Sequence, residues 1–123
     1  MDNAHAMEHT LDKTIKSGMN DLLRTMKKMR TLDPDIALPQ ILVFFFIASR
    51  GDGCTQTEVR DYLGMASATA SRNIAALSKV HRLGKEGLGV IDWKDDVLDR
   101  RVKRLALTSK GRQFLIDLLD IDA

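Results

Sequence analysis

The stretch from Thr57 to Lys79 limits the fold more than any other, because it has the pattern of two short helices joined by a tight turn. Its first half carries apolar residues at helical spacing, namely Val59, Tyr62 and Leu63. Gly64 follows them, and a residue without Cβ can take the left-handed conformation that ends a helix. We therefore predict a helix-turn-helix, although the same turn also joins helix pairs in folds that bind no nucleic acid.

The second helix of this pair is predicted to be capped by Ser67 and to bury one narrow stripe. Ala70, Ile74 and Leu77 recur at i, i+4 and i+7 and form that stripe. The other face has no acidic residue as far as Lys79. Small residues let a backbone approach closely, hydroxyls bond phosphate oxygens, and Arg or Asn can read base edges. This face is therefore predicted to suit a negatively charged groove, with candidate contacts from Ser67, Thr69, Ser71, Arg72, Asn73 and Lys79.

Composition fits one globular domain of 123 residues, since 44% of them are hydrophobic and 29% are charged. The net charge of +2 is too small to indicate a nucleic-acid partner by itself. The distribution of charge says more, because one segment contains six bases and no acid. These bases are Arg100, Arg101, Lys103, Arg104, Lys110 and Arg112.

Cysteine content and apolar runs bear on the compartment. The single cysteine, Cys54, excludes an internal disulfide, fits a reducing cytoplasm and is predicted to be a small buried side chain rather than a redox sensor. The most apolar segment, from Leu38 to Ala48, is much shorter than the roughly 20 residues that span a bilayer. The N-terminus lacks the pattern of a secretory signal. We expect a soluble cytoplasmic protein with no membrane partner.

Residues 1–10 are predicted to be a frayed tail. His5 and His9 are spaced i, i+4, as in some helical metal sites, but no third ligand is evident. A solvated tail is the favoured interpretation, and we predict no metal.

Residues 11–32 are predicted to form one long helix with a coiled-coil-like seam. The seam must be buried, either within the same chain or against a second subunit. Its length and its content of adaptable Met favour a dimer interface. The seam residues are Ile15, Met19, Leu22, Met26 and Met29.

Two prolines mark the boundary between the long helix and the next one. Pro34 ends the long helix, and Pro39 suits the first turn of the following one. Residues 41–48 are apolar on every face, which is typical of a central core helix.

The last third of the chain is predicted to be a hairpin and a helix. Residues 88–93 and 101–107 have the pattern of strands around a polar tip at residues 94–99. Thr108 is placed to cap a helix over residues 108–121. A helix-turn-helix followed by a basic hairpin is the layout of a winged helix, so we predict a mainly α fold in a single domain with its core over residues 39–107.

Two segments resemble one family. The segment from Asp99 to Gly111, DRRVKRLALTSKG, is similar to the wing of the MarR family of transcription regulators, and Thr57 to Leu77 resembles the helix-turn-helix of that family. The resemblance covers about residues 40–115. It implies a homodimer that places each recognition helix in a major groove and a wing arginine in the flanking minor groove.

The resemblance also implies roles for single residues. Arg101 or Arg100 would be the wing arginine, and Asp99 would orient it through a charge-assisted bond; Lys103 belongs to the same wing. Only twelve residues follow Gly111, fewer than is usual in that family, so we expect dimerisation to depend on the 11–32 helix alone or to use another geometry. The join from Lys79 to Trp93 departs from the family pattern, which predicts an unusual wing angle.

The leading hypothesis is a dimeric regulator that binds specific sequences of double-stranded DNA. The alternative is a winged-helix module for protein interaction or assembly, including a replication, partition or phage accessory role. An enzyme is not predicted, because no nucleophile, base and carboxylate occur at motif spacing and no phosphate-binding loop is present. No cofactor is predicted. The resemblance allows a small-molecule effector, for which the residues give no support.

Overall fold

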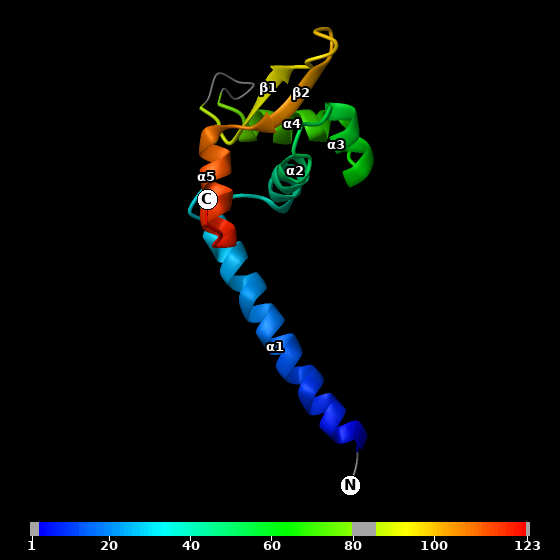
Figure 1. Ribbon diagram of the computed structural model, residues 1–123, viewed down its shortest axis with the longest axis vertical. Coiled ribbons are helices and arrows are strands. Elements are labelled where there is room, and N and C mark those ends of the chain that lie inside the picture. Colours follow the sequence, from blue (N-terminus) through cyan, green and yellow to red (C-terminus); the bar gives the residue numbers. More distant parts are fainter. Residues whose placement is uncertain (1–2, 80–85, 123) are drawn as a thin grey trace. The chain divides into compact units, whose positions relative to one another are not determined.

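The computed structural model describes residues 3–79 and 86–122, which form five helices and a two-stranded antiparallel sheet (Figure 1). The elements are, in chain order, α1 (Asn3–Met29), α2 (Leu38–Ser49), α3 (Gln56–Leu63), α4 (Ser67–Leu77), β1 (Ile91–Asp95), β2 (Lys103–Leu107) and α5 (Ser109–Leu119). This order confirms the predicted winged helix. The chain divides into two compact units, Met1–Pro34 and Asp35–Ala123, and the single domain stays a prediction.

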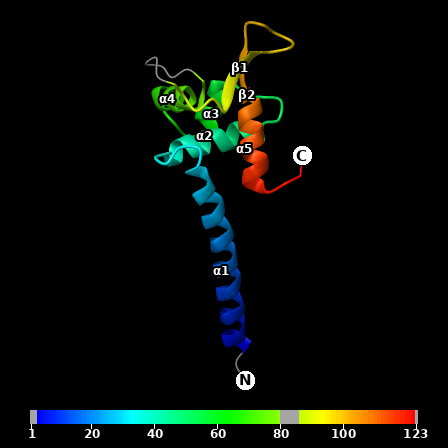
Figure 2. The same ribbon diagram turned by 90° about the vertical axis from the view of Figure 1, so that its left-hand side faces the viewer.

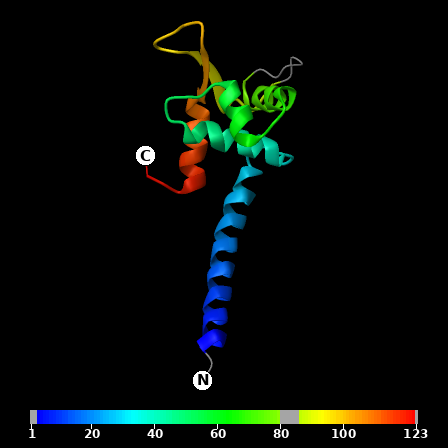
Figure 3. The same ribbon diagram turned by 90° about the vertical axis from the view of Figure 1, so that its right-hand side faces the viewer.

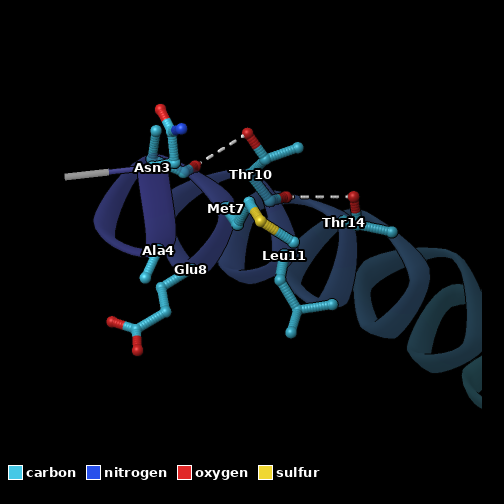
Figure 4. Close-up of a pocket in the computed structure, with 8 residues that line it drawn as sticks. Asn3, Ala4, Met7, Glu8, Thr10, Leu11 and Thr14 are labelled. Carbon is cyan, nitrogen blue, oxygen red and sulfur yellow. Dashed lines mark hydrogen bonds between the residues drawn. The ribbon is translucent and has the colours of Figure 1, made fainter.

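Helix α1 is longer than predicted. It begins at Asn3, so the frayed tail expected over residues 1–10 is wrong from Asn3 onward. Residues 3–10 include good helix formers and contain neither Gly nor Pro. The hydroxyls of Thr10 and Thr14 donate to carbonyl oxygens four residues earlier, at 3.1 and 3.0 Å (Figure 4). The helix then continues to Met29.

Helix α2 is the core of the second unit. Pro39 lies in its first turn, where a missing N–H leaves no helical bond unmade. The helix packs against α3, α4 and β2. Its buried side chains are Ile41, Val43, Phe44, Phe46 and Ile47, which confirms the predicted core helix.

Helix α3 is fixed at both ends. The Thr55 hydroxyl accepts a bond from the Glu58 N–H at 3.1 Å, and the Glu58 carboxylate accepts one from the Thr55 N–H at 3.1 Å. Gly64 ends the helix with φ 65° and ψ 37°, the left-handed conformation predicted for it.

Helix α4 begins differently from the prediction. Its N-cap is Ala66, which has no capping side chain, and Ser67 is the first helical residue. The Ser67 Oγ instead accepts a bond from Arg60 Nη1 at 3.1 Å. Ser67 therefore joins α4 to α3 across the turn and does not cap α4.

The hairpin strands are shifted relative to the prediction. β1 and β2 pair in a register that runs from Ile91 opposite Leu107 to Asp95 opposite Lys103. β1 begins late because the preceding backbone bonds the end of α4 instead, with Val90 N–H donating to the Leu77 carbonyl at 2.9 Å. Residues 80–85 of the join to the hairpin, which include Gly84, lie outside the described residues, and the unusual wing angle stays a prediction.

Helix α5 is attached to the start of the hairpin. The Thr108 hydroxyl accepts a bond from the Gly111 N–H at 3.1 Å, as predicted, and also donates to the Gly89 carbonyl at 2.6 Å. Gly111 is required sterically, because a Cβ there would lie 2.0 Å from the Val90 carbonyl oxygen.

We expect Gly111→Ala to lower the free energy of unfolding by about 1–3 kcal/mol, since the backbone of Val90 must move. Urea unfolding followed by circular dichroism measures this loss. Ser109→Ala, in the exposed part of the same turn, should stay within about 0.5 kcal/mol of the wild type. Equal effects of the two substitutions would contradict the close approach.

Candidate nucleic-acid interface

Helix α4 has a buried side and an outward side. The predicted stripe is confirmed, because Ala70, Ile74 and Leu77 are all buried. On the other side, Ser67 and Arg72 are exposed, and Lys79 is exposed just beyond the helix end. The remaining predicted contact residues, Thr69, Ser71 and Asn73, are half-buried. The polar side is thus at least partly accessible from Ser67 to Asn73 and again at Lys79.

The hairpin extends to the side of α4 opposite α2. All three views show α2, then α4, then the hairpin end in the same order (Figures 1, 2 and 3). Backbone pairing holds this arrangement, since Ser78 forms a parallel bridge with Ile91 at the start of β1. The outward side of α4 and the hairpin end therefore lie on the same side of the Asp35–Ala123 unit.

Asp99 and Arg101 form a two-pronged ion pair at the hairpin end. Arg101 Nε and Nη2 donate to the two Asp99 carboxylate oxygens, each at 3.1 Å, and the Arg101 backbone N–H donates at 3.0 Å. These bonds lower the pKa of Asp99 and raise that of Arg101. The Arg101 side chain is still 90% exposed. The charge-assisted bond expected between these two residues is present.

The rest of the basic segment is less free than the sequence indicated. Lys103 forms an ion pair with Asp95, the residue opposite it in the hairpin. Arg104 bonds Asp96, which lowers the pKa of that carboxyl, and lies 3.7 Å from a carboxylate oxygen of Glu58 in α3. Within the described ranges, Arg100 is exposed and forms no ion pair.

A hollow of about 510 Å³ lies between α3, α4 and β1. Ser71 and Lys79 line it together with Gln56, Asp92 and Trp93, none of which the sequence analysis singled out. Gln56 is the first residue of α3, and Trp93 is the middle residue of β1 and 39% exposed. The bridge between Ser78 and Ile91 brings Trp93 beside α4, and no local sequence pattern predicts this contact between distant residues.

The α1 seam is largely exposed in the single chain. The side chains of Ile15, Met19 and Leu22 are 52–54% exposed, Met26 is half-buried, and Met29 is buried. Because α1 begins at Asn3, the seam continues to Leu11 and Met7, which lie together on one side of the helix in Figure 4. The sequence analysis missed these two residues because it assigned the first ten positions to a tail.

Cys54 has a structural place, as predicted. It is fully buried, and burial raises its pKa to about 11. Its backbone N–H donates to the Leu105 carbonyl at 3.0 Å. Among the described residues, no group of three or more His, Cys, Asp or Glu side chains is placed to bind a metal ion. None of the described helices is long and apolar enough to cross a membrane.

Solved structures share this architecture. YusO from Bacillus subtilis superposes with a TM-score of 0.65 and 13% identity, over 98% of this chain and 77% of that one. A MarR-like transcriptional regulator from Thermotoga maritima gives a TM-score of 0.62 and 18% identity, over 98% and 74% of the two chains. The DNA complex of MepR from S. aureus gives 0.61 and 21%, over 90% and 83%.

The chain has a MarR-like winged-helix fold. No protein-family model matches the sequence, and no curated protein matches it. Within the MarR-like fold, the two segments that carried the resemblance are the α3–α4 pair and the returning strand with the start of α5. The fold expected from these two segments is confirmed.

The Asp99–Arg101 pair gives a testable pH dependence. The Asp99 carboxyl should titrate below its usual range, so the pair is present at neutral pH and is lost as pH falls through the lowered pKa. In Arg101→Ala the pKa of Asp99 should rise toward its ordinary value. The chemical shift of the Asp99 carboxyl carbon, followed by NMR as a function of pH, gives the pKa of Asp99 in the wild type and in Arg101→Ala. Arg100→Ala is the matched control and should leave the titration unchanged; an equal rise there would contradict a specific pair.

Proposed function

We propose that the protein is a regulator that binds specific sequences of double-stranded DNA as a homodimer. The observation that carries the proposal is that the acid-free outward side of α4 and the arginines of the hairpin lie on one side of the same unit. The MarR-like fold supports it, since a solved structure of that fold is a DNA complex. Action on DNA requires the protein to share a compartment with it, so a cytoplasmic location is part of the proposal.

Helix α4 would supply sequence specificity. Arg72 is exposed, and its nearest polar partner is the Thr69 hydroxyl at 3.5 Å, a weak bond that leaves the guanidinium available. Arg72 and Asn73 can pair with base edges in the major groove. Ser67, Thr69, Ser71 and Lys79 would bond phosphate oxygens and fix the register of the helix.

The hairpin would contact the flanking minor groove. Asp99 holds the Arg101 guanidinium in one orientation, and Arg100 adds a positive charge beside it. A narrow minor groove concentrates negative potential and attracts such arginines. Lys103 can contribute only by exchanging Asp95 for a phosphate.

Dimerisation would use the α1 seam. A stripe of half-exposed Ile, Met and Leu side chains over several turns has the spacing of a two-helix interface. Two copies related by a two-fold axis would present two α4 helices, so the DNA site should be an inverted repeat.

A second candidate function is a protein-docking module. The ion pairs of the hairpin favour it, because bases that already have carboxylate partners give the hairpin a lower affinity for a polyanion. Retention of duplex DNA at low salt, with a steep loss as salt rises, separates the candidates, since a pure docking module retains no duplex.

Selection of bound duplexes from a random pool should yield an inverted repeat. On the selected site, Arg72→Ala should cost about 1–3 kcal/mol of binding free energy and relax the preference at one base pair per half-site. Fluorescence anisotropy against single-base variants of the site measures both effects.

Arg24→Ala is the control, because Arg24 lies on α1 and pairs with Asp21. It should bind the selected site like the wild type. If Arg72→Ala weakened every sequence equally, a base-reading role for Arg72 would be wrong; if no sequence were enriched, specific DNA binding itself would be wrong.

Leu22→Asp should convert the dimer to a monomer at micromolar concentration, because a carboxylate would be buried in the seam. Sedimentation velocity measures the change. Ser17→Asp places the same charge on the opposite side of α1, at about 100° of rotation per residue, and should remain dimeric. A wild-type chain that is monomeric, or a dimer that survives Leu22→Asp, would rule out this interface.

A further inference from the structure

Two apolar side chains stand at the end of the hairpin. Val97 is 98% exposed and Leu98 is 96% exposed, while the next most exposed large apolar side chain in the described ranges is Met7 at 71%. They lie between β1 and β2 in the loop that extends beyond α4 (Figure 1). Exposure of adjacent branched apolar residues is unfavourable in water, so their place in the loop at the hairpin end indicates a binding partner.

The backbone around the pair is held by specific bonds. The Asp96 carboxylate accepts bonds from the Leu98 N–H at 2.8 Å and from the Asp99 N–H at 3.3 Å. The Val102 N–H donates to the Asp99 carbonyl at 3.0 Å and closes the loop. The apolar pair is thus presented on a preorganised turn, which lowers the entropic cost of binding.

The surroundings of the pair hold both bases and carboxylates, and Asp52 lines the same hollow as Val97 and Leu98. The three carboxylates of the hairpin end, Asp95, Asp96 and Asp99, are each paired with a base. Within the described ranges, Lys94 and Arg100 are exposed and form no ion pair. An apolar point with cationic neighbours is complementary to the minor groove of duplex DNA, where phosphates flank apolar sugar edges.

We propose that Val97 and Leu98 form a wedge that enters the minor groove and partly unstacks one base step. The wedge rests on the proposed DNA-binding function and adds a source of specificity to it. Pyrimidine–purine steps such as TA unstack most easily, so the wedge favours them at the flank of the site. Leu98 would enter the step, while Val97 would pack against the neighbouring sugar.

The test uses the selected duplex with 2-aminopurine at the flanking step. Wild-type protein should raise the fluorescence of this base, because unstacking relieves quenching, and should bend the duplex in a circular-permutation gel assay. The double variant Val97→Thr, Leu98→Ser should abolish the rise, reduce the bend and weaken binding about tenfold or more, as expected for losing the burial of one Leu side chain. Leu98→Ser alone should give most of the effect.

Ile121→Ser is the matched control, since it changes an apolar side chain that is 53% exposed beyond the end of α5, and it should behave like the wild type. Urea unfolding should be unchanged in the variants of Val97 and Leu98, because these side chains are almost fully exposed.

The wedge would be overturned if the double variant bound the duplex with wild-type affinity and raised the 2-aminopurine fluorescence as the wild type does. The DNA-binding function would still stand in that case if Arg72→Ala lost sequence specificity. Absence of duplex binding by the wild type at low salt would overturn both. Loss of a bound protein partner in the double variant, without any effect on duplex DNA, would assign the pair to protein docking and overturn the wedge.

Discussion

Burial of the narrow α4 stripe against α2 is the contact on which the rest of the second unit depends. Ala70 lets the two helices approach closely, and Ile74 and Leu77 fill the space along the same side. Only one face of α4 can enter the core, since the residues from Ser67 to Asn73 outside the stripe include hydroxyl, amide and guanidinium groups whose burial without partners is costly. Packing therefore fixes the rotation of α4 about its axis, and with it the set of side chains that faces outward.

Hydrogen bonds then tie the hairpin to this helix pair. Val90 bonds the last turn of α4, Cys54 pairs with Leu105 in β2, and Arg104 reaches Glu58, which also caps α3. Main-chain bonds between fixed elements allow little rotation of one relative to the other. The hairpin end is thus positioned by the same core that orients α4, and the candidate interface is a consequence of packing rather than of the charged residues themselves.

The sequence predicts what local patterns determine. The stripe of α4, the glycine stop at Gly64 and the Thr108 cap each depend on a few neighbouring residues, and all three are present. The cap assigned to Ser67 is wrong because Arg60, seven residues earlier, takes its hydroxyl across the turn. The ion pairs of the hairpin could not be read from the chain either, since they depend on a register that sets Asp95 opposite Lys103. The DNA contacts and the α1 interface stay predictions.

The ion pairs of the hairpin limit the affinity that its bases can add to the proposed complex with DNA. Lys103 and Arg104 already have carboxylate partners, so a phosphate contact by either one exchanges one ion pair for another and gains little. In the part of the chain that the structure describes, Arg100 and the apolar turn beside it have no carboxylate partner to give up when they contact DNA. In the proposed complex, therefore, the hairpin contributes through its shape and through the unpaired Lys94 and Arg100, while Arg72 and Lys79 supply the cationic contacts of the α4 side. Such a division of roles makes non-specific binding weak relative to binding at a site whose flank can accept the hairpin.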